Sequence, residues 1–215
     1  MSRLLTSCLA VAAGLALLNA PAALSASSGW FGRNLVVNGG AELGAASSNG
    51  TIYVRVPAWS PVPGKSPINV VNYGYDDFPA INAPGPTLRG KHLFFGGVLP
   101  DAAGKQSVNL APLAGTIDAG LVRFNFSAYL GGWSSQADEA TATVSFEPSG
   151  RAYRIGPVTM QQRNSTTELL LRGASGVVPT GTRSARVTLE MYRLSGTSND
   201  GYVDNVALVL TNGRR

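Results

Sequence analysis

Two short segments of the chain combine flat aromatic side chains with carboxylates or amides. The residues concerned are Tyr73, Tyr75, Asp76, Asp77 and Phe78 in the first segment, and Trp133, Gln136 and Asp138 in the second. Arg163 could add a fork of hydrogen-bond donors to either segment. Aromatic faces stack on the apolar side of a sugar ring, and planar polar groups pair with its hydroxyls. These residues are therefore the candidates for contacting a glycan.

Each segment also has a purely structural interpretation, and the sequence leaves both interpretations open. Trp133 could plug the end of the domain, and the loop from Tyr73 to Phe78 could pack on the domain through its own aromatic rings. Trp59 is interpreted as a core residue, and His92, beside an apolar run, as a half-buried histidine with its hydrogen bonds satisfied.

The inventory of reactive side chains argues against common catalytic machinery. The chain has one Cys and one His in 215 residues, which excludes a disulfide framework, a Cys-rich zinc site and a His-cluster metal site. No Gly-x-Ser-x-Gly elbow, HExxH motif or phosphate loop occurs. We therefore predict no catalytic residues. A polysaccharide lyase or hydrolase stays open as an alternative, using Tyr129, Arg123, Lys91 and His92, or a carboxylate pair such as Asp76 with Asp77.

The basic charge of the chain does not indicate a nucleic-acid partner. The formal net charge is +5, and the sequence pI is about 9.7. The basic residues are scattered along the chain rather than gathered in a stripe, and no RNA-binding motif is present. Charged residues make up only 13% of the chain, well below the roughly 25% of an average soluble domain.

The N-terminal segment has the layout of a secretory signal peptide. Arg3 is followed by an apolar run from Leu4 to Leu18 and then by small residues that suit cleavage near residue 25. The run is shorter than the ~20 residues that cross a bilayer. We divide the chain into a cleaved signal peptide over 1–26, a linker over 27–33, one domain over 34–211 and a polar tail over 212–215. This division predicts a protein that is secreted, extracellular or periplasmic, with no membrane anchor.

Alternation of apolar and polar residues predicts strands through most of the remaining chain. In Leu121 to Leu130, the apolar set Val122, Phe124, Phe126, Ala128 and Leu130 shares one face. Similar runs follow at 140–146, 168–172, 184–194 and 202–210, and turns are predicted at Gly131-Gly132 and Asn199-Asp200-Gly201. The stretch from Pro57 to Gly104 indicates long loops between short strands. This pattern predicts an all-β fold, an antiparallel β-sandwich.

Three segments together resemble one family of domains. They are Asn34 to Glu42 with Trp59 following, Ser127 to Trp133, and the closing run from Asn199 to Leu208 with its Asp204-Asn205-Val206 core. In order and spacing they are similar to extracellular carbohydrate-binding modules of the galactose-binding-domain-like superfamily. The resemblance implies a jelly-roll sandwich and a glycan or polysaccharide as partner. It favours no particular oligomeric state.

Two acidic residues, in the first and the last of these three segments, are candidate metal ligands. Asp204 lies in an otherwise apolar strand, where an unpaired charge would be costly to bury, and Glu42 follows the opening segment. Related modules often hold a structural Ca²⁺ between these two elements, so the resemblance implies a calcium site at Glu42 and Asp204. The alternative is that both carboxylates accept hydrogen bonds from backbone amides or pair with an arginine.

The sequence therefore leaves three functions open. The first is a secreted, non-catalytic glycan-binding protein. The second is a structural or adhesive extracellular protein without a small ligand, and the third is the lyase or hydrolase described above. The loop aromatics favour the first.

Overall fold

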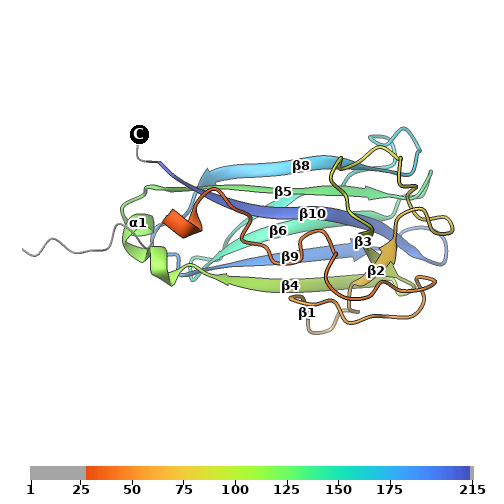
Figure 1. Ribbon diagram of the computed structural model, residues 1–215, viewed down its shortest axis with the longest axis horizontal. Helices are drawn as coiled ribbons and strands as arrows, with labels where there is room; N and C mark the ends of the chain where they lie inside the picture. The colour runs from red at the N-terminus through yellow and green to blue at the C-terminus, as the bar shows by residue number, and fades with distance from the viewer. Residues whose placement is uncertain (1–27, 214–215) are drawn as a thin grey trace, which may run out of the picture.

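The computed structural model describes residues 28–213, and these residues form two antiparallel five-stranded sheets packed face to face (Figure 1). The first sheet has the order β1 (Ser60–Pro61), β4 (Asp101–Asn109), β9 (Ser184–Tyr192), β6 (Glu139–Glu147) and β7 (Arg151–Ile155). The second has the order β2 (Asn69–Asn72), β3 (His92–Gly97), β10 (Asn199–Asn212), β5 (Val122–Gly132) and β8 (Glu168–Val177). The predicted antiparallel β-sandwich is confirmed. The predicted signal peptide lies outside the described residues.

In the described part of the chain, helical structure is confined to short elements. These are the 3-10 helices η1 (Ser28–Trp30) and η2 (Ala111–Leu113) and the helix α1 (Ala114–Asp118). Within residues 28–213, no helix is long and apolar enough to span a membrane. Within the predicted linker, Phe31 pairs with Leu210 of β10 and Trp30 packs against the core.

The inward faces of the strands carry the predicted core. In β5 the side chains of Val122, Phe124, Phe126, Ala128 and Leu130 are all buried between the sheets. Trp59 joins this core, as predicted: it is 8% exposed and its ring meets Phe94 edge-on at 5.4 Å. Alternation works here because successive side chains of a strand point to opposite faces of its sheet.

Both predicted glycine turns at the loop end are wrong. Gly131 and Gly132 belong to β5 and pair with Tyr202 and Gly201 of β10. A Cβ at Gly131 would stand 1.9 Å from the carbonyl oxygen of Glu168, so this glycine allows two backbones to approach closely rather than turning the chain. The strands therefore extend further toward the loops than predicted, and β10 includes a candidate site residue, Asp200.

A second apolar cluster covers the outer face of the second sheet at one end. Its buried members are Val71, Tyr73, Leu93, Phe95, Leu169 and Tyr202. The segment between β2 and β3 lies over this face, where the N–H of Leu169 donates to the carbonyl of Pro84 at 3.1 Å. The second cluster arises because the long loops fold back on the sheet and bury its outer side chains.

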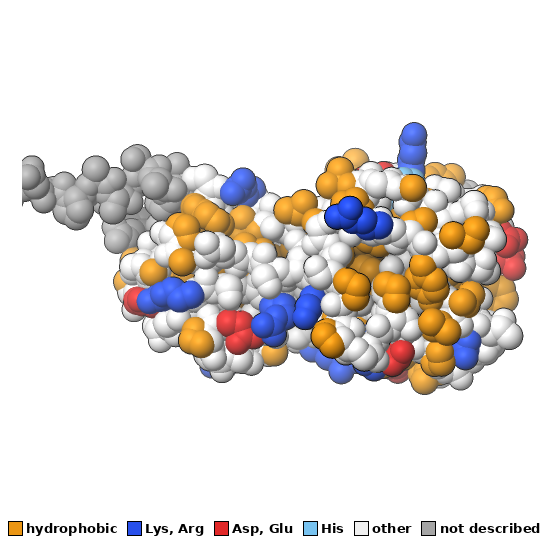
Figure 2. Space-filling model, turned by 90° about the horizontal axis from the view of Figure 1, so that it is seen from below, with side chains coloured by type: hydrophobic (Ala, Val, Ile, Leu, Met, Phe, Trp, Pro, Cys, Tyr) orange, Lys and Arg blue, Asp and Glu red, His pale blue; other side chains and the backbone are white. Residues whose placement is uncertain are grey.

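The loops gather at one end of the sandwich, on the right of Figure 1, whereas α1 and the C-terminal end of β10 lie at the other. That loop end is broad and shows many apolar side chains on the face drawn in Figure 2. The exposed apolar residues of the loops include Ile52, Tyr75, Ile81, Leu88, Leu99 and Leu194.

Candidate functional site

A pocket of about 310 Å³ opens among the loops at the broad end of the sandwich. It brings the two predicted segments together, since both contribute to its lining although they are far apart in the chain. The predicted residues that line it are Asp76, Asp77, Phe78, Trp133 and Gln136. Further lining comes from Asn49, Thr51, Phe95, Val98, Ser198, Asp200 and Tyr202, among others.

The aromatic side of the pocket is anchored in the second apolar cluster. The ring of Phe78 meets Phe95 edge-on at 5.0 Å and Tyr202 at 6.4 Å. Trp133 is partly buried against the same cluster while also lining the pocket. Both structural alternatives considered for these rings therefore describe part of what they do: the rings pack on the domain and still present a face to the pocket.

Asp200 is the functional candidate that the sequence misassigned. It was predicted as a turn residue, but it belongs to β10, is 8% exposed and lines the pocket. Its Oδ1 accepts a hydrogen bond of 3.1 Å from the hydroxyl of Tyr202. Burial raises the pKa of Asp200 to about 6, and the nearby charges of Asp138 and Asp77 add to this rise against the opposing Tyr202 hydrogen bond. The sequence feature that could have identified Asp200 is the two-residue period of a strand, which places Asp200, Tyr202 and Asp204 on one face of β10.

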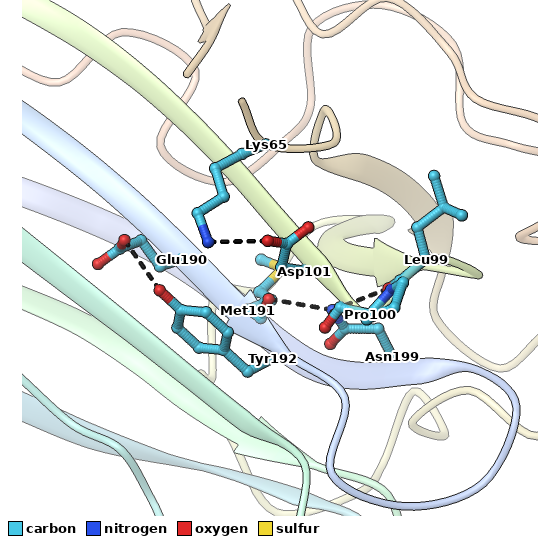
Figure 3. A network of polar contacts seen from close by, with 8 residues as sticks. All are labelled: Lys65, Leu99, Pro100, Asp101, Glu190, Met191, Tyr192 and Asn199. Atoms are coloured by element: carbon cyan, nitrogen blue, oxygen red, sulfur yellow. Dashed lines mark hydrogen bonds and ion pairs between the residues drawn. The ribbon is translucent and has the colours of Figure 1, made fainter. Parts of the chain in front are cut away.

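The start of β10 is held in place by a network at the junction of the two sheets (Figure 3). The side-chain amide of Asn199 donates to the carbonyls of Met191, Leu99 and Pro100 at 3.0, 3.3 and 3.4 Å. A Cβ on Gly96, in the neighbouring strand β3, would lie 2.3 Å from Cγ of this amide group, so this position favours glycine. These contacts fix the backbone on which Asp200 and Tyr202 stand.

Asp138 does not contact the pocket, which corrects the prediction for this residue. Its side chain is buried, and Oδ1 accepts hydrogen bonds from the backbone N–H groups of Leu194 and Ser195 at 2.7 and 2.8 Å. Oδ2 accepts one from the N–H of Asp200 at 2.8 Å. The carboxylate thus holds the backbone of the segment that leads to Asp200, on the side away from the pocket.

Arg163 is likewise buried beneath the pocket rather than exposed in it. Its guanidinium donates to four backbone carbonyls, those of Gly132, Ser134, Thr166 and Gln136, at 2.5 to 2.9 Å. Burial lowers the pKa of this guanidinium from its ordinary value. The prediction that it contacts a ligand is corrected: its donors are used to hold the loop that carries Trp133.

The two tyrosines of the first segment also lie away from the pocket lining. Tyr73 is 8% exposed, and its hydroxyl donates to Oδ2 of Asp204 at 2.8 Å. Burial, with the adjacent Asp204 charge, raises the pKa of Tyr73 far above its usual range. Tyr75 is 46% exposed and is not among the lining residues.

Glu42 and Asp204, the predicted calcium ligands, lie near each other on the outer side of the second sheet. Oε1 of Glu42 accepts the N–H groups of Lys91 and His92 at 2.9 and 2.8 Å, and Oδ1 of Asp204 accepts the N–H of Asn205 at 2.6 Å. These are the backbone hydrogen bonds of the alternative interpretation. Burial raises the pKa of Asp204 to about 8, and the charge of Glu42 contributes to the rise while Tyr73, Asn205 and Arg89 oppose it.

The surroundings of Gly40 test whether these residues could fit a cation. The position of a Cβ on Gly40 would be 3.1 Å from Oδ1 of Asn205, 3.6 Å from Oδ1 of Asp204 and 3.9 Å from Cγ of Glu42. Oxygens of Asn205 and Asp204 therefore face Gly40, and oxygen is the donor that Ca²⁺ prefers. The nearest atom of Glu42 is a carbon, and its carboxylate oxygens lie next to Gly90. In residues 28–213 no group of three or more His, Cys, Asp or Glu could hold a metal ion, so backbone or amide oxygens would have to complete the shell.

No protein-family model matches the chain, and no curated protein matches it. Among solved structures, the apo form of a cyclase from Fischerella sp. is 14% identical, with a TM-score of 0.52 over 85% of this chain and 97% of that one. TmCBM61 in complex with β-1,4-galactotriose is 16% identical, with a TM-score of 0.47 over 84% and 99% of the two chains. Family 16 Carbohydrate Binding Module-2 is 19% identical, with a TM-score of 0.48 over 82% and 99%.

The chain is a β-sandwich with jelly-roll architecture, as its three motifs implied. Carbohydrate-binding modules are among its structural neighbours. At 14% identity, the likeness to the cyclase is one of fold alone.

Proposed function

We propose that this protein is a non-catalytic glycan-binding protein whose site is the pocket at the loop end. One observation carries the proposal: two segments distant in the sequence converge on one pocket, where Trp133 and Phe78 offer aromatic surface and Asp76, Asp77 and Gln136 offer polar groups. This combination suits a sugar, which has an apolar ring face and a rim of hydroxyls. Loops on a rigid sandwich are also a usual place for binding residues.

The size of the pocket supports a small ligand portion rather than a long buried chain. Its volume of about 310 Å³ is at the lower end of the roughly 300–1,000 Å³ of small-molecule sites. We infer that it takes one sugar ring, or the end of a polysaccharide, with the rest of the chain in solvent.

A glycan array probed with the protein, followed by titration calorimetry on the best ligand, tests this proposal. Trp133→Ala should weaken binding by about tenfold or more, since stacking on an aromatic ring contributes on the order of 1.4 kcal/mol. Tyr75→Ala is the matched control, because Tyr75 is an exposed aromatic residue outside the pocket lining. Absence of binding to every glycan, or equal losses in the two variants, would contradict the proposal. Binding to matrix or to itself, uninhibited by free sugars, would point instead to an adhesive protein.

We further propose that a structural Ca²⁺ sits beside Gly40, held by Glu42, Asp204 and neighbouring oxygens. A bound cation would offset the cost of burying the Asp204 carboxylate, which otherwise favours its protonated form. The ion would tie the segment before β1 to β10.

The N-terminal segment supports a proposal about location: residues 1–26 direct the protein out of the cytoplasm and are then removed. Mass spectrometry of the protein recovered from its native host should give a chain beginning near residue 26. A chain that retains the segment would contradict this proposal.

A second candidate function, sugar hydrolysis, is favoured by one observation. Asp200 has a pKa raised to about 6 and lies in the same pocket as Asp77, and a protonated acid with a second carboxylate is the machinery of glycosidases. His92 and Tyr129, the residues considered for a lyase, do not line the pocket. Release of reducing ends from an oligosaccharide, abolished in Asp200→Asn, would establish hydrolysis in place of simple binding.

A further inference from the structure

The charged groups that line the pocket are all of one sign. Asp76, Asp77 and Asp200 contribute carboxylates, and none of the lining residues within 28–213 is Lys, Arg or His. This is unusual in a chain with a formal net charge of +5. The local field in the pocket therefore opposes that of the whole chain, and a ligand experiences the local one at close range.

Two arginines next to the pocket donate to backbone carbonyls. Arg163 donates to the carbonyls of Gly132, Ser134, Thr166 and Gln136. Arg193 donates to the carbonyls of Val98 and Thr197, two lining residues, at 2.9 and 2.6 Å. Neither arginine is among the lining residues, and Nε of Arg163 is buried without a hydrogen-bond partner within residues 28–213, so neither guanidinium is placed to pair with a carboxylate or sulfate on a ligand.

The pocket holds one buried acceptor that lacks a donor, and a carboxylate that is only partly hydrogen-bonded. Oε1 of Gln136 is buried and has no hydrogen-bond partner within residues 28–213. Asp200 is 8% exposed; its Oδ1 accepts from the hydroxyl of Tyr202, whereas its Oδ2 accepts no hydrogen bond within residues 28–213 and is not a fully buried atom. A buried acceptor without a donor is costly, so a ligand that brings a donor to Gln136 and a positive charge to Asp200 would be favoured.

We propose that the glycan bound in this pocket carries a free amino group, so that the ligand class is a cationic, unacetylated amino sugar and uronic acids are rejected. This inference rests on the proposed glycan-binding function and specifies its ligand. An ammonium group supplies three donors and a positive charge, which match the unpaired acceptor and the carboxylates together. A metal ion fits less well, since the described residues include no group of three acidic or other ligating side chains that could hold one.

The test compares three trimers by calorimetry near neutral pH: β-1,4-linked glucosamine, its fully N-acetylated counterpart, and galacturonate. We expect the amine to bind about tenfold or more tightly than the N-acetylated trimer, with the difference shrinking at high salt, and galacturonate to bind weakest. Equal affinity for the amine and the N-acetylated trimer would overturn this inference while leaving the proposed function intact. Failure of the whole glycan array would overturn both.

Variants separate the pocket from general electrostatic attraction. Asp77→Asn and Asp200→Asn should each remove most of the preference for the amine over the N-acetylated trimer. Asp77 is exposed, so its variant keeps the test valid if Asp200→Asn fails to fold. Glu190→Gln, on the first sheet and outside the pocket lining, is the matched control and should leave the preference unchanged. A preference that survives both pocket variants would contradict the assignment.

Discussion

The carboxylate of Asp138 accepts a hydrogen bond of 2.8 Å from the backbone N–H of Asp200, behind the wall of the pocket. The same carboxylate accepts two further N–H groups from the loop after β9. One buried side chain thus fixes the loop between β9 and β10 relative to β6. The acid that faces the pocket, Asp200, is positioned by an acid that does not face it.

Replacing Asp138 with Ala should therefore destabilise the protein strongly. Three backbone N–H groups would lose a charged acceptor, and we expect the free energy of unfolding to fall by about 3 kcal/mol or more. Urea unfolding followed by tryptophan fluorescence measures this. Asp138→Asn keeps one acceptor oxygen and should lose less. If Asp138→Ala and Asp138→Asn were equally stable to within about 0.5 kcal/mol, the hydrogen bonds that Asp138 accepts would not stabilise the fold.

Arg163 provides a second prediction about the base of the pocket. Its planar guanidinium serves four carbonyls at once, which a lysine ammonium with three donors cannot reproduce. Arg163→Lys should lower stability by about 2–4 kcal/mol. Arg172→Lys, at a partly exposed arginine that also donates hydrogen bonds, is the control and should change stability by less than about 1 kcal/mol. Equal losses of stability in the two variants would show that the four hydrogen bonds of the buried Arg163 guanidinium add no stability beyond that of a partly exposed arginine.

The sequence predicted the strands well because their inward faces alternate. The runs at 140–146 and 184–194 correspond to β6 and β9 with small shifts at their ends. It failed where backbone approach, rather than patterning, decided the structure. Gly131 and Asn199-Asp200-Gly201 have the composition of turns but continue strands, because long-range pairing of β10 with β5 and β3 outweighs local preference.

The candidate site was predictable only in part, for a related reason. Composition identified Asp76, Asp77, Phe78, Trp133 and Gln136, which the fold brings to one pocket. Composition could not distinguish them from Asp138 and Arg163, because a polar side chain in a loop serves a ligand or the backbone according to which groups are buried around it. That environment is set by residues distant in the sequence.

The calcium proposal predicts a stability that depends on the ion. If Ca²⁺ binds only the folded protein, saturation at about 100-fold above its Kd adds about 2.7 kcal/mol, which at this chain length raises Tm by about 5–10 °C. Addition of a chelator should reverse the rise. Glu42→Gln should abolish the calcium effect, whereas Glu190→Gln should retain it. A Tm that is the same with calcium and with chelator would rule out a stabilising ion beside Gly40.

Asp200 gives the protein a pH dependence whose sign can be worked out. Burial raises its pKa in the folded protein to about 6, whereas an unfolded Asp has a pKa near 3.9. Between about pH 4 and pH 6 the folded state retains a proton that the unfolded state has released, so the free energy of unfolding should fall as pH rises through this window. Above about pH 6 the contribution is constant, since both states are then ionised.

The measurement is the difference in unfolding free energy between the wild type and Asp200→Asn, taken at steps across that window. The substitution removes the titrating group, so the stability of the variant relative to the wild type should increase from about pH 4 to pH 6 and then level off. Glu190→Gln, outside the pocket lining, should run parallel to the wild type in the same window. A constant difference for Asp200→Asn would mean that Asp200 ionises as readily in the folded pocket as in the unfolded chain, and its burial among Tyr202, Asp138 and Asp77 would then carry no electrostatic cost.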